Sequence, residues 1–245
     1  MTRLRKRIYD AYLDGGPAAV HLESEGDLVR RSATMNSLIS RHFPDNPGAQ
    51  ILDVGCGYGA LLYFARKHGY ANLQGVDISP QQVALAQRLG ISGVSQGDLL
   101  ETLRAQPPGT VDVIVALDVI EHFTKDELID LVDAIARALK PGGRWLIQAP
   151  NGESPFCGAI RYGDMTHEQA FTRSSLEQLL LASGFSAVAV HETPPVVHGI
   201  KSAVRWVLWQ LIRLCLRIWS LSETGDSGRK TVFTRNLLAV ATRGD

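Results

Sequence analysis

Residues 51–59 read Ile51-Leu52-Asp53-Val54-Gly55-Cys56-Gly57-Tyr58-Gly59 and join a short apolar run to a helical pattern that starts at Ala60. Three glycines at alternate positions allow a tight turn and let a ligand lie against bare backbone. The spacing G-x-G-x-G is shorter than the G-x-G-x-x-G of dinucleotide-binding loops. The carboxylate of Asp53 would repel a pyrophosphate but suits a cationic amino group. The stretch therefore predicts a strand, a ligand-binding loop and a helix in direct succession.

The chain beyond this loop repeats the change from strand to helix. Short β-branched runs predict strands at 51–54, 73–76, 111–117 and 144–148, with a weak strand before Gly97. Amphipathic runs predict helices at 60–68, 80–89 and 125–139. This alternation implies parallel pairing with helices on both faces, a doubly wound α/β fold. Such sheets bind ligands at the carboxyl ends of their strands, so the loops there should carry the chemistry.

Acidic residues stand at two of these strand ends. Asp77 lies 77 − 53 = 24 residues after Asp53, where a carboxylate can accept hydrogen bonds from ribose hydroxyls. The alternative role for Asp77 is to cap the helix that starts at Ser79-Pro80. Asp98 can receive an adenine amino group or cap the following helix, and the residues alone favour neither role.

The fourth predicted strand runs into Asp118-Val119-Ile120-Glu121-His122-Phe123. An acidic segment that contains a histidine, at the carboxyl end of a strand, is well placed for a reacting centre. The alternative is that His122 is a structural or helix-capping residue.

Together these motifs resemble the class I S-adenosylmethionine-dependent methyltransferase superfamily, over about residues 49–150. The matching segments are Leu52–Gly59, Gly75–Ser79, Leu117–Phe123 and Leu139–Gly143. The resemblance implies a mostly parallel, seven-stranded, Rossmann-like sheet whose last strand is antiparallel. It also implies S-adenosylmethionine as cofactor, released as S-adenosylhomocysteine. Asp53 and the glycines would hold the methionine end, Asp77 the ribose, and Asp98-Leu99 the adenine. The expected cofactor residues are Asp53, Gly55, Cys56, Gly57, Gly59, Asp77, Ile78, Asp98, Leu99, Leu117 and His122.

The segments Pro150–Phe156 and Arg161–Thr172 carry a narrower resemblance. They are similar to bacterial methyltransferases of polysaccharide and O-antigen gene clusters. This resemblance implies a role in polysaccharide biosynthesis, with a saccharide or lipid-linked glycan as methyl acceptor.

Three ionisable residues of this region, Asp164, His167 and Glu168, lie in a loop expected to hang over the methyl group. Methyl transfer to a hydroxyl needs in-line approach of the oxygen and a group that removes its proton. We expect His167 to be that base, supported by Asp164, with His122 as the second candidate. The alternative is that Asp164 and Thr166 are turn residues and that His167 bonds a neighbouring helix.

Expected contacts with the acceptor come from two segments and comprise Tyr162, Glu168, Arg205 and Arg213. No metal is expected, because these acidic residues and histidines lack a recognisable ligand spacing.

Residues 203–221 predict an amphipathic helix that contains three arginines. Each arginine would cost about 2.5–3.5 kcal/mol at a bilayer centre, so the segment is a poor membrane span. One interpretation is a helix that lies at a membrane surface. A second is a lid that grips an anionic acceptor, and a third is a cap that buries its apolar face on the sheet or in a dimer.

The composition limits the function classes further. The 245 residues include 25 basic and 25 acidic side chains, so charge gives no argument for nucleic-acid binding. Three scattered cysteines suit a reducing compartment. The basic amino terminus is not followed by an apolar run of signal length. We therefore expect a cytoplasmic enzyme. The sequence leaves open whether it attaches peripherally to the inner face of the membrane, and whether it is a monomer or a homodimer.

The domain organisation expected from these patterns has four parts. They are a helical cap at 1–48, the cofactor-binding core at 49–192, an inserted cap helix at 193–230 and the last strand of the core sheet at 231–245. A helix at 174–183 and strands at 187–191 and 232–241 complete the pattern.

The activity expected is O-methylation of a saccharide or lipid-linked glycan by in-line transfer. The alternatives are O-methylation of a small phenolic or quinone-like molecule, or a non-catalytic cofactor-binding subunit.

Overall fold

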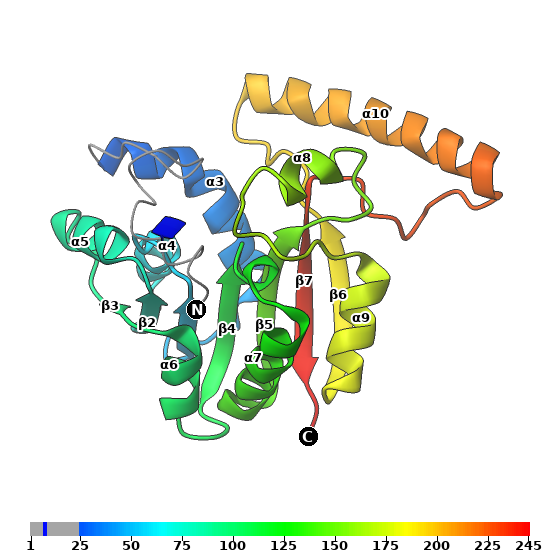
Figure 1. Ribbon diagram of the computed structural model, residues 1–245. Coiled ribbons are helices and arrows are strands. Elements are labelled where there is room, and N and C mark those ends of the chain that lie inside the picture. The colour runs from blue at the N-terminus through cyan, green and yellow to red at the C-terminus, as the bar shows by residue number, and fades with distance from the viewer. Residues whose placement is uncertain (1–6, 9–24) are drawn as a thin grey trace.

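The computed structural model describes residues 7–8 and 25–245, and its centre is one seven-stranded sheet (Figure 1). The strand order is β3-β2-β1-β4-β5-β7-β6, and β7 runs antiparallel to both of its neighbours. This order confirms the predicted doubly wound, mostly parallel sheet. The strands are β1 (Gln50–Val54), β2 (Asn72–Asp77), β3 (Val94–Gln96), β4 (Val111–Leu117), β5 (Leu139–Pro150), β6 (Phe185–Glu192) and β7 (Asn236–Arg243).

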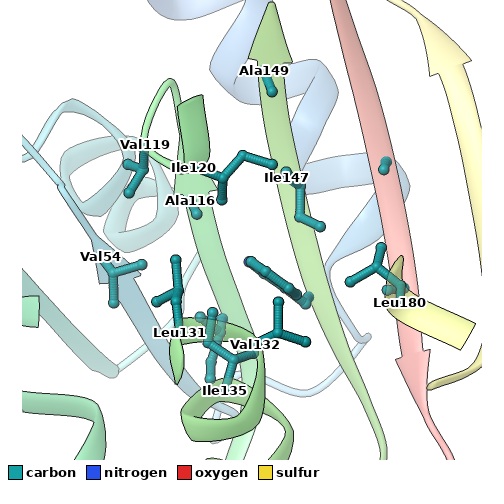
Figure 2. Close-up of a cluster of buried hydrophobic side chains, with 14 of the residues drawn as sticks. Val54, Ala116, Val119, Ile120, Leu131, Val132, Ile135, Ile147, Ala149 and Leu180 are labelled. Carbon is teal, nitrogen blue, oxygen red and sulfur yellow. The ribbon is translucent and has the colours of Figure 1, made fainter. Parts of the chain in front are cut away.

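Helices cover both faces of the sheet and bury a separate apolar core on each. One face carries α3 (Glu25–His42), α4 (Ala60–Lys67) and α5 (Pro80–Arg88); the other carries α6 (Leu99–Ala105), α7 (Lys125–Ala138) and α9 (Arg173–Ala182). Alternate residues of β4 serve the two cores, because successive side chains of a strand point to opposite faces. Val113 and Val115 pack on the first face, and Ile114 and Ala116 pack on the second. Figure 2 shows Ala116 in the core of the second face.

Two strands differ from their predicted limits. β5 begins at Leu139 rather than Arg144, because Leu139 pairs with Val111 before a register shift and the paired run resumes at Arg144. β7 begins at Asn236 rather than residue 232. Carbonyl groups just before β7 form hydrogen bonds with a side chain instead of a neighbouring strand, since Asn151 Nδ2 donates to the carbonyls of Val232 and Thr234.

Three segments lie outside the strand–helix alternation. Nearly half of the predicted N-terminal cap at 1–48 lies outside the described residues, and its described part is mainly α3. A short helix α8 (Cys157–Arg161) and a long helix α10 (Ile200–Thr224) lie beyond the carboxyl ends of β4 and β5 (Figure 1). In the part of the chain that the structure describes, no helix combines the length and the hydropathy needed to cross a bilayer.

Candidate active site

A cavity of about 830 Å³ opens at the carboxyl ends of β1, β2 and β4. This volume lies in the range of pockets that enclose a small ligand. The cavity brings together twelve of the residues expected to bind cofactor or catalyse: Asp53, Gly55, Cys56, Gly57, Asp77, Ile78, Asp98, Leu99, Leu117, His122, Asp164 and His167.

The glycine loop after β1 forms one wall of the cavity and is bonded to β2. The amides of Gly55 and Cys56 both donate to Val76 O, at 2.8 and 3.1 Å. Gly55 has a φ of +71°, and a Cβ atom there would meet Val119 Cγ2 at 2.5 Å. A side chain at position 55 would therefore be strained and would collide with the segment that follows β4. The glycine keeps bare backbone at the cavity wall.

Asp77 is held in place by two backbone donors. Its Oδ2 accepts from Gly57 N and its Oδ1 accepts from Ser79 N, each at 2.8 Å. These bonds join the glycine loop to the start of α5, where Ser79 caps the helix. Each carboxylate oxygen has a second lone pair, so Asp77 can also accept from a ligand hydroxyl.

Burial raises the pKa of two carboxyl groups of the cavity, those of Asp53 and Asp77. Burial, followed by the charge of Asp77, raises the pKa of Asp53 well above its usual value. Burial also raises the pKa of Asp77, although the bonds from Ser79 and Gly57 oppose it. A bound cationic group would favour both carboxylates. These two acceptors therefore fit a ligand that donates hydrogen bonds from an ammonium group and from ribose hydroxyls.

Asp98 combines a structural role with a place at the cavity wall. Its Oδ1 accepts from Glu101 N at 3.0 Å, so it caps α6 as the sequence allowed. An adenine contact by its second oxygen stays a prediction.

The segment after β4 turns sharply before it presents His122. Asp118 has a φ of +57°, a conformation that aspartate tolerates better than most residues. Its carboxylate accepts from Gln148 Nε2 at 3.0 Å and from Asn236 Nδ2 at 3.2 Å. These bonds fix the position of Asp118 at the cavity wall. A 3-10 helix, Ile120–His122, then places His122 on the cavity wall.

His122 is oriented by a chain of hydrogen bonds from the loop after α8. Thr166 Oγ1 lies 2.6 Å from Asp164 Oδ1 and 2.8 Å from His122 Nδ1. An ionised carboxylate only accepts, so the hydroxyl proton of Thr166 goes to Asp164. The hydroxyl oxygen then accepts from His122 Nδ1–H, which leaves the lone pair of the ring on Nε2.

The charge on Asp164 supports this chain. Burial acts against its ionisation, but the hydrogen bonds from Thr166 and the nearby His122 and His167 outweigh burial and lower the pKa of Asp164. Asp164 is therefore a carboxylate at neutral pH, as the assigned proton positions require.

His167 and Glu121 lie beside this chain. His167 Nδ1 is 3.1 Å from the carbonyl of Ile160 in α8, so this nitrogen carries the hydrogen. Its Nε2 is 3.9 Å from Glu121 Oε1, and its ring meets the ring of His122 edge-on at 4.8 Å. Burial, followed by the charge of Asp118, raises the pKa of Glu121 well above its usual value. The Nδ1 atom of His167 therefore bonds a neighbouring helix, α8, as the alternative interpretation of this residue predicted.

The same cluster can offer ligands to a metal ion. One ligand atom each from Glu121, His122 and His167 lie within 4.8 Å of one another. The sequence had argued against a metal because Asp164, His167 and Glu168 showed no recognisable ligand spacing. The prediction that no metal binds here stays a prediction.

Five predicted site residues lie apart from the cavity wall: Gly59, Tyr162, Glu168, Arg205 and Arg213. Gly59 caps α4 with a φ of +81°, and a Cβ there would meet Val94 Cγ2 at 2.6 Å, so its role is packing. Tyr162 is exposed on the outer side of the loop. Arg213 Nε is 2.7 Å from Glu192 Oε2, so its guanidinium is paired within the protein.

Arg31, Gln148 and Asn236 line the cavity but were not predicted from the sequence, and Asp118 and Glu121 were expected there only as part of the acidic segment 118–123. Gln148 had a visible signal, since it is a polar residue directly after the apolar run Trp145-Leu146-Ile147. Arg31 had none, because only the packing of α3 on the sheet brings it to this edge.

Known proteins share both the sequence pattern and the fold. A family model described as a methyltransferase domain matches residues 29–190, more than half of the chain. A ubiquinone biosynthesis O-methyltransferase of Idiomarina loihiensis is 30% identical over 62% of this chain and 68% of its own length. One of the same name from Xylella fastidiosa is 35% identical over 46% of each chain, so the match spans less than half of that relative.

Solved structures agree on the fold. A SAM-dependent methyltransferase from Archaeoglobus fulgidus superposes with a TM-score of 0.66, at 18% identity, over 97% of this chain and 99% of that chain. A Haemonchus contortus phosphoethanolamine N-methyltransferase in complex with S-adenosylhomocysteine gives 0.64 at 16% identity, over 97% of this chain and 61% of that chain. The shared feature is the mostly parallel seven-stranded sheet.

Proposed function

The chain belongs to the methyltransferase domain family and is an S-adenosylmethionine-dependent methyltransferase, and on that premise we propose that it O-methylates a small phenolic or quinone-like acceptor. The observation that carries the proposal is the hydrogen-bonded chain Asp164–Thr166–His122 at the cavity wall. A histidine oriented in this way suits removal of a proton from a hydroxyl.

The cofactor residues follow from the cavity. S-adenosylmethionine, when bound, supplies an electrophilic methyl group on a sulfonium. Asp53 would accept from the ammonium group of the methionine end, and the guanidinium of Arg31 would pair with the carboxylate of the methionine end. Asp77 would accept from the ribose hydroxyls, and Asp98-Leu99 would border the adenine. These residues position and hold; they take no part in bond making.

His122 is our first choice for the proton acceptor, in place of His167. His122 Nδ1–H is committed to Thr166, so Nε2 is the nitrogen that can take a proton. The carboxylate of Asp164 then stabilises the imidazolium through Thr166, much as a buried aspartate supports a catalytic histidine elsewhere. His167 Nε2 faces Glu121 instead, and we assign it a supporting role.

A phenolic acceptor is favoured over a glycan by the names of the curated relatives and by the cavity wall. The relatives are called ubiquinone biosynthesis O-methyltransferases, which places an oxygen among their acceptor atoms. Beside His122 and His167 the wall is formed by Leu117, Phe123 and Ile160, which suit a flat apolar ring. The saccharide or lipid-linked glycan suggested by residues 150–172 stays the competing prediction.

The test is transfer of label from methyl-labelled S-adenosylmethionine to a panel of acceptors. The panel holds catechols, prenylated dihydroxybenzenes, saccharides and lipid-linked glycan extracts. Label in the phenols supports the proposal, and label in glycans alone overturns it. Cofactor binding with no labelled product in any arm would favour a non-catalytic subunit.

A chelator arm separates a histidine base from a metal-assisted reaction. If His122 takes the proton unaided, turnover survives prolonged treatment with chelator. Loss of turnover that magnesium or zinc restores would assign proton removal to an ion held by Glu121, His122 and His167.

A further inference from the structure

Helix α10 exposes its apolar side to solvent, the reverse of an ordinary surface helix. A surface helix buries its apolar stripe and exposes its polar one. In α10 the half-buried arc contains Gln210, Arg213, Arg217 and Ser220, whereas the apolar arc faces outward. Figure 1 shows the helix extended along the outside of the molecule, beyond the carboxyl ends of the strands.

The outward arc forms a continuous apolar surface, which we call the α10 outer face. Its large side chains are between 50% and 86% exposed: Ile200, Val204, Val207, Leu208, Leu211, Ile212, Leu214, Ile218, Trp219 and Leu221. At 1.5 Å per residue, a helix of 25 residues is about 37 Å long. An apolar surface of this extent on one element marks an interaction site.

Polar contacts hold α10 in this orientation. Arg213 on the inner arc pairs with Glu192, whose other oxygen accepts from Phe233 N at 3.2 Å. At the start of the helix, Ser202 Oγ donates to Gly199 O and accepts from His198 N. Arg213 is thus paired within the protein, while the apolar side of the helix faces outward.

The charges of α10 indicate the nature of that partner. Four basic residues, Lys201, Arg205, Arg213 and Arg217, precede its single acidic residue, Glu223. Lys201 and Arg205 are exposed and lie on one flank of the α10 outer face. Basic residues that flank an apolar arc with tryptophans are typical of helices that lie in the headgroup region of anionic membranes.

We propose that α10 binds an anionic lipid bilayer, with its axis in the membrane plane and the α10 outer face in the acyl boundary. A second copy of this chain is the competing occupant, and the exposed Lys201 and Arg205 beside the apolar arc favour the anionic bilayer over it. The loop around α8 lies beyond the same edge of the sheet (Figure 1) and exposes Phe156, Tyr162 and Met165. That loop also lines the cavity, so the bilayer would lie near its entrance. The proposal does not rest on the identity of the acceptor.

Vesicle co-sedimentation of the full chain tests the proposal. The probes are phosphatidylcholine vesicles with and without phosphatidylglycerol. We expect the double variant Leu211→Glu/Ile218→Glu to lower partitioning more than about tenfold. Lys201→Gln/Arg205→Gln should lower binding to the anionic vesicles about 30-fold, from about 1 kcal/mol for each basic residue, and change little without phosphatidylglycerol.

Ile129→Glu is the matched control, since Ile129 is an exposed residue of α7 on the body of the protein. It should bind vesicles like the wild type, and all variants should keep cofactor affinity. Wild-type protein that stays in the supernatant with anionic vesicles overturns the proposal. So does a lipid-free dimer, seen by sedimentation velocity, that Leu211→Glu/Ile218→Glu dissociates, because the α10 outer face would then be a contact between copies.

Discussion

Buried carboxyl groups at the cavity lower stability to serve the site. Glu121 is 1% exposed and its neighbours include Asp118 and Asp164, both acidic. Folding raises its pKa above the ordinary 4.5, so the folded protein holds this proton more tightly than the unfolded chain. Its stabilising contribution is complete below 4.5 and is lost as the pH rises through the raised value.

We therefore expect Glu121→Gln to be more stable than the wild type at neutral pH and to show a weaker fall in stability with rising pH. Urea unfolding over a series of pH values measures both effects. Free energies of unfolding that run parallel in the two proteins would mean that the pKa of Glu121 is not raised. A loss of turnover in the more stable variant would show that the carboxyl group serves function.

The two histidines should separate kinetically. Because His122 is assigned as the proton acceptor, His122→Gln should lower the methyl-transfer rate by about 10²–10⁴ and leave cofactor affinity nearly intact. Thr166→Val should lower the rate less and shift its pH profile, because it breaks the link to Asp164. Rates should be compared with those of His167→Gln. A larger loss in His167→Gln than in His122→Gln would return the base to His167.

Asp77 should contribute to binding and not to chemistry. Asp77→Ala removes the acceptor for the ribose hydroxyls and also frees the amides of Gly57 and Ser79. We expect cofactor affinity to fall by about 1–3 kcal/mol. Titration calorimetry measures this, with Asp98→Ala as a comparison at the adenine end. Unchanged affinity for Asp77→Ala would remove Asp77 from the ribose site.

At the level of elements, α10 should depend on one buried ion pair. Glu192 keeps only 13% of its side-chain area exposed, so removal of Arg213 would leave a poorly solvated charge. Arg213→Met should therefore speed hydrogen exchange in residues 200–224 while leaving α7 unchanged. Exchange measured by mass spectrometry on both segments provides the control. Equal protection of α10 in variant and wild type would show that the pair does not hold the helix.

The elements also show where sequence reasoning works. Helix α7 was predicted at 125–139 and spans Lys125–Ala138, because a Thr124–Glu127 capping box starts it and an amphipathic pattern runs through it. The limits of β5 and β7 were wrong because they depend on partners. A register shift against β4 extends β5, and the side chain of Asn151 delays β7. Such contacts leave no local signature.

Across the whole molecule, the same distinction applies to the site. Glycine spacing and the acidic residues at strand ends were sufficient to predict many of the residues that line the cavity, while their contacts with a cofactor stay a prediction. Other parts of the wall were less predictable, because Arg31 and Asn236 reach the cavity from segments far apart in the chain. The face of α10 that meets solvent was not settled by its periodicity either. Periodicity identifies an apolar arc, but only tertiary contacts decide which way that arc points.

The proposed reaction is methyl transfer to a phenolic oxygen with His122 as base. The most direct measurement is carbon NMR of the product formed from S-adenosylmethionine labelled with ¹³C in its methyl group, with a prenylated dihydroxybenzene as acceptor. We predict one aryl O-methyl signal with the wild type, and its loss with His122→Gln under cofactor saturation. An N-methyl or glycan O-methyl product, or an undiminished aryl signal with His122→Gln, would contradict the account.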